Sequence, residues 1–193
     1  MDLTEDERWL EEFLKWVVAN KGLVESTKEA YGRDLRSFCD WLQSHDVTLT
    51  TAAEDQIVSY VGHIRDLGYQ ISTVARTVVA IRQFFGFLVY EREVLSEDPS
   101  AEIAVPTVPD GSPKALTIEQ IQSLLESPVG EEPVIYRDRA ILEVLYGCGL
   151  RVGELVGLQV DDVDLDGQLL RVFGKGRRER IVPVGSLAAN SLS

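Results

Sequence analysis

Five of the ten residues from Arg171 to Arg180 are basic, although the chain as a whole is acidic. In this stretch "GKGRRER" puts Lys175 between two glycines and sets Arg177, Arg178 and Arg180 beside it. Glycine permits tight turns and a close approach of the backbone to a ligand. Two interpretations stay open on composition alone. One is an ordinary solvated turn, and the other is a phosphate-contacting tip that enters a nucleic-acid groove.

A second candidate for chemistry is "GCGLRVGELVGL", in which Glu154 follows Arg151 by three residues. Residues i and i+3 share a helix face, so the two side chains can form a surface ion pair, which stabilises a helix by ~0.2–0.5 kcal/mol. Alternatively, Glu154 holds the Arg151 guanidinium so that it faces a phosphate, whose oxygens this planar group matches bidentately. The spacing is compatible with both.

Metal and cofactor chemistry find little support in the residue types. "DVDLDG", from Asp162, matches the start of an EF-hand calcium loop, but the twelfth position is Phe173 and not the bidentate glutamate that the loop needs. An acidic turn is the better explanation. The two histidines are isolated, and two cysteines are too few for a disulfide or zinc framework. We therefore expect no metal site and no cofactor.

Size and charge limit the class of protein. The chain has 193 residues, enough for one medium or two small domains, and its formal net charge is -13. Nucleic-acid-binding domains are usually basic, but electrostatic fields are screened over ~10 Å, so a local basic patch can still contact DNA. There is no signal-peptide pattern and no apolar run of ~18 residues. We expect a cytoplasmic protein with no membrane partner.

The first half of the chain has helical periodicity and no strand signal. Apolar spacing predicts four helices, over 3–20, from a cap at Ser26 or Thr27, over 51–67 and over 72–91, which together favour a small helical bundle at 1–95. Four of the seven prolines follow within 96–114. Because proline fixes φ and removes a backbone donor, this stretch is predicted to be an extended linker.

Residues 115–193 indicate a second, α+β domain. Thr117 is placed to cap a helix, "PVIYRDRAILEVLYGCG" predicts another and "LRVGELVGLQ" a short third. "GQLLRVFG" and "RIVPVG" then flank the basic turn as the strands of a β-hairpin would. A hairpin on a few helices makes a thin core, so we expect this segment to be the incomplete first part of a domain.

The motifs occur in an order that resembles a known family. "GLRVGEL", "DVDLD", "GKGRRER" and "VPVG" resemble tyrosine recombinases of the phage-integrase type, particularly the Xer subfamily. "STKEAYGRDLRSFCDWL" and "VARTVVAIRQFFGFLVYE" resemble the helical core-binding domain of that family, so the resemblance covers nearly the whole chain. It implies a mainly α fold, in which a four-helix core-binding (SAM-like) bundle precedes the first part of an α+β catalytic domain with a β-hairpin.

The resemblance also implies an activity. Members of this family cut and rejoin paired DNA sites through a 3′-phosphotyrosyl intermediate, and Xer members resolve chromosome dimers before cell division. Arg151 matches the first catalytic arginine, which stabilises charge in the transition state. Lys175 matches the hairpin lysine, the general acid for the leaving 5′-oxygen, and Glu154 matches a supporting acidic position. The implied partners are a double-stranded DNA recombination site, a like or related recombinase subunit in a tetramer, and a DNA translocase.

Candidate DNA contacts follow from the same resemblance, which places the second and fourth helices against major grooves. The alternative for each of them is a solvated helix face or turn. The contacts expected are Lys28, Arg33 and Arg36 on the second helix, Thr73, Arg76 and Arg82 on the fourth, and Arg177, Arg178 and Arg180 on the hairpin.

One departure from the family pattern is large. The family also uses a second arginine in an H-x-x-R motif, a further His or Trp, and a tyrosine nucleophile, all beyond the hairpin, but no His, Arg or Tyr follows Val184. Without the nucleophile no covalent intermediate forms, so we expect residues 1–193 to be inactive alone. An alternative is a truncated, non-catalytic DNA-binding protein derived from a recombinase. A helical protein–protein interaction module would leave both basic motifs unexplained.

Overall fold

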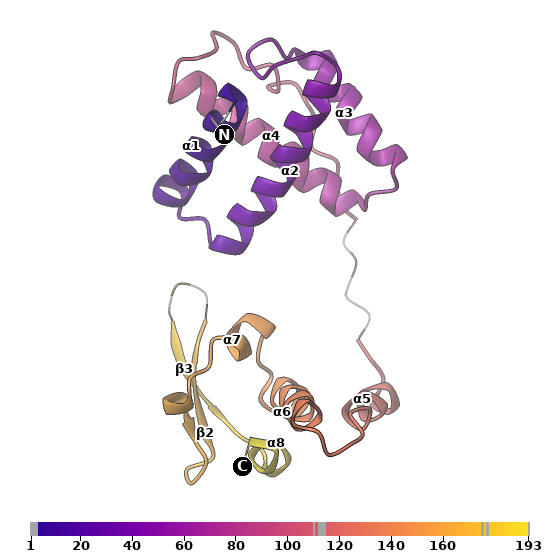
Figure 1. The fold of residues 1–193 in the computed structure, drawn as a ribbon, viewed down its shortest axis with the longest axis vertical. Helices are drawn as coiled ribbons and strands as arrows, with labels where there is room; N and C mark the ends of the chain where they lie inside the picture. Colours follow the sequence, from indigo (N-terminus) through magenta and orange to yellow (C-terminus); the bar gives the residue numbers. More distant parts are fainter. Residues whose placement is uncertain (1–3, 110, 112–114, 175, 177, 193) are drawn as a thin grey trace. The chain divides into compact units, whose positions relative to one another are not determined.

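The computed structural model describes residues 4–109, 111, 115–174, 176 and 178–192. The chain divides into two compact units, Met1–Gly111 and Ser112–Ser193, and the division falls inside the proline-rich stretch 96–114 (Figure 1). Each unit has its own cluster of buried apolar side chains. The two units are therefore described one at a time.

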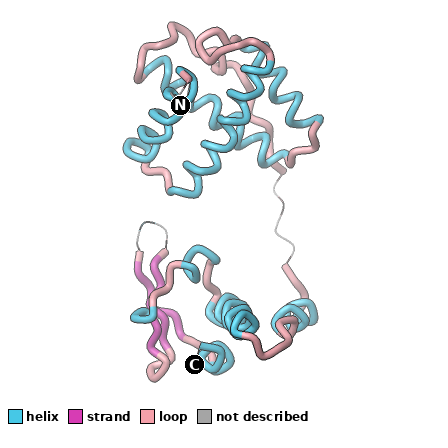
Figure 2. Tube along the Cα trace, viewed as in Figure 1, coloured by secondary structure: helices cyan, strands magenta, loops and turns pink. Residues whose placement is uncertain are grey.

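The first unit is a bundle of four helices joined by short loops (Figure 2). Its helix α4 contacts each of the other three and so forms the centre of the bundle. The predicted bundle is confirmed, but the predicted cap of the second helix is wrong. That helix begins one residue before Ser26, after Val24, and has no side-chain cap. The bounds are α1 (Glu5–Lys21), α2 (Glu25–Ser44), α3 (Glu54–Asp66) and α4 (Ile71–Tyr90).

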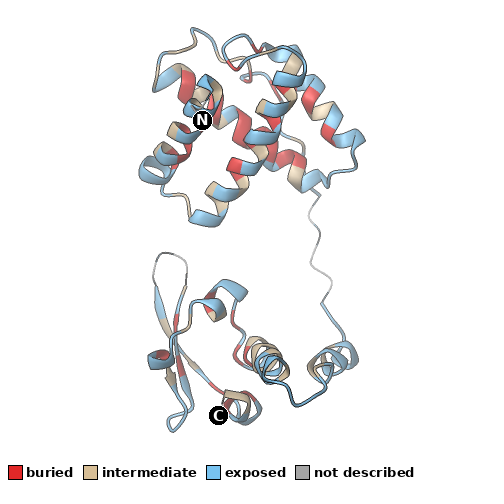
Figure 3. Ribbon diagram, viewed as in Figure 1, coloured by how far each residue is buried: buried red, intermediate tan, exposed pale blue. Residues whose placement is uncertain are grey.

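The core of the first unit is aromatic and fully enclosed. Phe13, Phe38, Phe84 and Phe85 have no exposed surface, and Figure 3 shows the buried residues concentrated where the helices face one another. Of the described helices, α4 alone is long and apolar enough to cross a membrane, but more than half of that stretch is buried in the bundle. Packing in the bundle core therefore explains why α4 is so apolar.

The first part of the proline-rich stretch packs on the bundle. Ile103 is buried in the bundle core, and its carbonyl lies 3.4 Å from Nη1 of Arg82 on α4. Just before it, Asp98 Oδ1 accepts hydrogen bonds from the backbone N–H and the hydroxyl of Ser100, at 2.8 and 2.6 Å. These contacts hold the chain against the first unit as it leaves α4.

The second unit sets a small antiparallel sheet, in the order β1-β2-β3, against helices. The predicted hairpin is confirmed as β2 and β3, with Val172 opposite Arg180. Three elements were not predicted: a short 3-10 turn before the sheet, the two-residue strand β1 and the helix α8. The bounds are α5 (Ile118–Leu125), α6 (Pro133–Cys148), α7 (Val152–Val156), a 3-10 turn η1 (Val160–Asp162), β1 (Val163–Asp164), β2 (Leu169–Phe173), β3 (Glu179–Pro183) and α8 (Ser186–Leu192).

One face of the sheet supplies the core of the second unit. Leu170 and Val172, alternate residues of β2, are fully buried, whereas Leu169 before them, Arg171 between them and Phe173 after them are exposed. This is the alternation expected of a half-buried strand. Helix α8 adds small side chains to the same cluster and packs on α6, since Ala188 lies within contact distance of the position a side chain would take at Gly147.

Candidate functional site

Glu154 is the centre of the candidate site, because its buried carboxylate draws together two segments of the second unit. Arg151 immediately precedes α7, and Glu154 lies in the first turn of that helix. The backbone N–H of Arg151 donates to Glu154 Oε2 at 2.8 Å, and Arg151 Nη1 donates to Oε1 at 3.0 Å. The glutamate therefore caps the helix N-terminus and holds the arginine at once.

Arg180 on β3 is the second partner of this carboxylate. Its Nη1 donates to Glu154 Oε1 at 2.7 Å, and its Nη2 donates to Oε2 at 2.9 Å. This two-bond geometry is the strongest form of an arginine–carboxylate contact. Figure 1 shows α7 beside the hairpin, and the Glu154–Arg180 pair joins these two elements.

The electrostatic result is a firmly ionised glutamate under an exposed arginine. The hydrogen bonds from Arg180, followed by the backbone N–H of Arg151, lower the pKa of Glu154 from its usual 4.5 to about 2. Its side chain is 5% exposed, whereas that of Arg151 is 81% exposed. A surface ion pair does not describe this geometry, because one partner is buried. It fits the alternative interpretation, in which the buried Glu154 carboxylate holds one nitrogen of Arg151 and leaves the rest of the guanidinium exposed.

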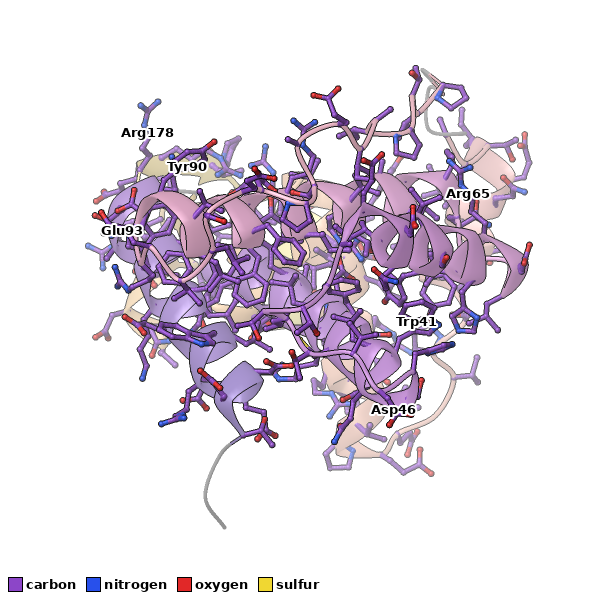
Figure 4. All side chains as sticks on the ribbon, turned by 90° about the horizontal axis from the view of Figure 1, so that it is seen from above. Trp41, Asp46, Arg65, Tyr90, Glu93 and Arg178 are labelled. Atoms are coloured by element: carbon purple, nitrogen blue, oxygen red, sulfur yellow. The ribbon has the colours of Figure 1, made fainter. Side chains whose placement is uncertain are left out.

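The base of the basic turn lies next to the same carboxylate. The N–H of Gly174 donates to the carbonyl of Arg178 at 2.8 Å, which closes the hairpin end. A Cβ atom at Gly174 would lie 3.4 Å from Glu154 Oε1, which places the base of the turn next to this carboxylate. Arg178 is exposed and its side chain extends away from the ribbon (Figure 4). Lys175 and Arg177 lie outside the described residues.

A second buried carboxylate belongs to Asp162, the first residue of the acidic turn "DVDLDG". Asp162 accepts from Arg171 Nε at 2.9 Å and from the backbone N–H of Gln159 at 3.0 Å. Asp164 instead accepts from the N–H of Gly167 at 2.8 Å, which makes "DVDLDG" a self-bonded acidic turn. Among the residues that the structure describes, no group of three His, Cys, Asp or Glu side chains is arranged to hold a metal ion.

On the bundle, the candidate DNA contacts of α2 are the less constrained ones. Arg33 and Arg36 are exposed, and neither forms an ion pair with any side chain in the described part of the chain. Lys28 is paired with Glu25 of the preceding turn at 2.8 Å. The two free guanidinium groups are spaced i and i+3, so they share a face of α2.

The candidate contacts of α4 are largely engaged with the protein. Arg76 makes two hydrogen bonds with Asp34 of α2, at 2.8 and 3.1 Å, and this pairing raises the pKa of Arg76 further. Arg82 reaches the carbonyl of Ile103, as described above, and Thr73 is half-buried in the first turn of α4. The sequence analysis did not single out Asp34, because its partner Arg76 lies on another helix and no local spacing signals such a contact.

Comparison with known families defines the class of the protein. The model of the phage integrase N-terminal SAM-like domain matches residues 10–92, and the model of the phage integrase family matches residues 114–193. The chain therefore belongs to the phage integrase family, the family of the tyrosine recombinases.

Individual relatives show which members of the family the chain resembles. The tyrosine recombinase XerD of Haemophilus influenzae is 39% identical over 98% of this chain and 60% of the relative, and that of Pseudomonas putida is 40% identical over 95% and 61%. The chain thus spans about three fifths of the length of these relatives. A lambda integrase tetramer bound to a Holliday junction has a TM-score of 0.70 at 17% identity, over 94% of this chain and 52% of that one, which shows the shared fold.

Proposed function

We propose that this chain contributes the DNA-reading bundle and the first part of the active site of a site-specific tyrosine recombinase of the Xer type. The observation that carries the proposal is the buried Glu154 carboxylate, which holds Arg151 beside the base of the basic hairpin turn. The similarity to proteins named tyrosine recombinase XerD supports the choice of reaction.

The proposed roles follow from charge and exposure. Arg151 stabilises the negative charge that develops on the scissile phosphate, because its exposed guanidinium keeps donors free to match phosphate oxygens. Lys175 protonates the leaving 5′-oxygen as general acid. Glu154 touches no substrate in this scheme and acts by orienting Arg151.

The proposed partner is a double-stranded DNA recombination site. Arg33 and Arg36 contribute the main bundle contacts, with Lys28, Thr73 and Arg82 at the edges, and Arg177 and Arg178 contact phosphates from the hairpin. Arg76 supports this surface by bonding Asp34 of α2, and its charge is paired with that carboxylate. A like or related recombinase subunit, and a DNA translocase, complete the reaction in the cytoplasm, where Xer-type recombination resolves chromosome dimers.

Residues 1–193 alone are proposed to form no covalent link to DNA. Tyr31 and Tyr60 are buried in the bundle core, and burial raises the pKa of both. The other four tyrosines, Tyr69, Tyr90, Tyr136 and Tyr146, are exposed, but none matches the family's nucleophile motif. A nicked suicide substrate should therefore give no covalent adduct. Adduct formation that Lys175→Ala abolishes would contradict this.

The first test of the proposed function is DNA binding by this chain. We expect a ~30-base-pair Xer-type recombination site to bind more tightly than a scrambled duplex over a salt series, because base contacts survive salt better than phosphate contacts do. Fluorescence anisotropy measures both affinities. Equal affinity for the two duplexes, lost at moderate salt, would mean that the chain makes phosphate contacts only and would remove site recognition from the proposal.

A further inference from the structure

Two arginines share one buried carboxylate at the candidate site, and their positions differ in a way that assigns them different tasks. Arg180 occupies both Glu154 oxygens through Nη1 and Nη2, at 2.7 and 2.9 Å. Arg151 reaches Oε1 with one side-chain nitrogen at 3.0 Å and is far more exposed than Arg180, 81% against 39%. One glutamate and two arginines leave a single net positive charge, and the exposed group of the three is Arg151.

We infer that Arg180 is a positioning residue that neutralises Glu154, so that Arg151 stays available to a phosphate. This inference rests on the proposed function, since it concerns how Arg151 meets DNA. A buried carboxylate needs a charged partner. If Arg180 did not supply it, the Arg151 guanidinium would have to turn inward to neutralise Glu154, and its charge would be cancelled where the phosphate binds.

The same contact fixes the hairpin. Arg180 lies opposite Val172, whose side chain is fully buried, so the guanidinium approaches Glu154 from the core side of the sheet. Gly174, at the base of the turn, borders both Glu154 Oε1 and Arg180 Nη1. Arg180 therefore places the hairpin end and Arg151 around one carboxylate, without itself facing a ligand.

Removing the charge of Arg180 separates its positioning role from a direct contact with DNA. Arg180→Gln should weaken binding to the recombination site by about tenfold, because Glu154 then cancels Arg151. The double variant Glu154→Gln/Arg180→Gln restores the single net positive charge and should recover about threefold of that loss, but not all of it, because a neutral amide orients Arg151 less firmly than the carboxylate does. A double variant as weak as Arg180→Gln would mean that Arg180 itself contacts DNA and would overturn the inference.

The neighbouring pair supplies a matched control. Arg171→Gln breaks an equivalent contact to the buried Asp162 from the adjacent strand, but does not touch Glu154. It should leave affinity within about twofold. A tenfold loss in this control as well would show that general loosening of the sheet explains the result. If Arg180→Gln fails to fold, by circular dichroism, Arg180→Lys takes its place. A single ammonium group does not match both Glu154 oxygens, so Arg180→Lys should weaken binding and Glu154→Gln/Arg180→Lys should recover part of the loss. No recovery would contradict the inference.

A readout without DNA keeps this inference distinct from the proposed function. Nitrogen-15 NMR measures rotation of the Arg151 guanidinium, which should slow in Arg180→Gln and recover in the double variant. Unchanged rotation in Arg180→Gln would overturn the inference whatever the DNA result. If instead rotation changes as expected but the unaltered chain binds no duplex, the proposed function fails and the charge-sharing role of Arg180 stands.

Discussion

Glu154 is the residue on which the site depends, because four N–H donors from two segments of the chain converge on its two oxygens. Arg151 contributes its backbone N–H and one side-chain nitrogen, and Arg180 contributes two more side-chain donors. Hydrogen bonds to the charged form favour ionisation more than partial burial opposes it, which is why the pKa falls. The same bonds link the start of α7 to β3, so protonation of a single carboxyl group affects both elements.

That linkage predicts a pH dependence with a defined sign. The pKa of Glu154 is about 2 in the folded chain and 4.5 without partners, so its stabilising contribution is complete above about pH 4.5 and is lost as the pH falls toward 2. The difference in unfolding free energy between the unaltered chain and Glu154→Gln should therefore shrink over that range and stay constant above it. Urea titrations at a series of pH values measure it. A difference that does not change between pH 5 and 2 would contradict the assignment.

At the residue scale, the sequence predicted the pair of Arg151 with Glu154 but not the contact of Arg180 with Glu154. The spacing of Arg151 and Glu154 was enough to pair them, because i and i+3 share a helix face. Arg180 was expected to contact DNA, since composition alone cannot tell which face of a strand points inward. In β3 the apolar Ile181 is exposed and Arg180 points toward Glu154, the reverse of what hydrophobicity suggests. The direction of the Arg180 side chain follows only from the strand register and from the position of the buried glutamate.

At the scale of elements, the contact of α2 with α4 sets the geometry of the proposed DNA-reading surface. Two polar pairs cross between these helices, Arg76 with Asp34 and Gln83 with the hydroxyl of Tyr31 at 3.2 Å. Along the chain the partners run in opposite directions, which is the order that an antiparallel packing produces. Arg76 therefore affects α2, and with it Arg33 and Arg36, through Asp34.

A double-mutant cycle tests this pairing. Arg76→Ala and Asp34→Ala should each destabilise the chain, and the coupling free energy between them should be about 0.5–1 kcal/mol, because the pair is bidentate but Arg76 is partly exposed and screened by solvent. Chemical denaturation of the two single variants and the double variant measures this coupling. A coupling free energy near zero would mean that the two side chains do not cooperate in solution.

The hairpin gives a second prediction at this scale. Leu170→Ala should destabilise the hairpin by about 2–4 kcal/mol, because its side chain is fully buried in a small core that cannot refill the cavity. The adjacent Leu169 is 40% exposed, so Leu169→Ala is the matched control and should cost less than about 1 kcal/mol. Hydrogen exchange of the β2 and β3 amides measures both. Similar losses for the two variants would contradict the register of the strand.

Long, periodic elements were predictable, and short ones were not. The four bundle helices have clear apolar spacing, and the strands of the hairpin were predicted from their apolar character. Strand β1 has two residues, too few to show a period, and it forms by pairing with β2. Helix α8 buries Ala188 and Ala189, small side chains that carry almost no hydrophobic signal, and it is held by its contact with α6. Both depend on tertiary contacts that no local pattern encodes.

At the scale of the whole molecule, a chain with a net charge of -13 must bring a few local cations to a polyanion. Its overall field disfavours approach to DNA, so the affinity depends on individual arginines that are not neutralised within the protein. Among the candidate DNA contacts of the bundle, the exposed arginines with no ion pair or hydrogen bond in the described part of the chain are Arg33 and Arg36, since Arg76 is paired with Asp34 and Arg82 reaches the carbonyl of Ile103. The proposed surface is therefore narrow, and removing a small number of charges should have a large and measurable effect.

The salt dependence of binding counts those charges. Each arginine that contacts a phosphate adds about 0.9 to the slope of log affinity against log salt concentration, so Arg33→Ala/Arg36→Ala should reduce the slope by about 2. Arg65→Ala is the control, because Arg65 is also exposed but lies on α3, outside the proposed surface. Anisotropy titrations between low and moderate salt give each slope. If Arg65→Ala lowered the slope as much per charge, binding would reflect general electrostatics, and α2 would have no special place in DNA recognition.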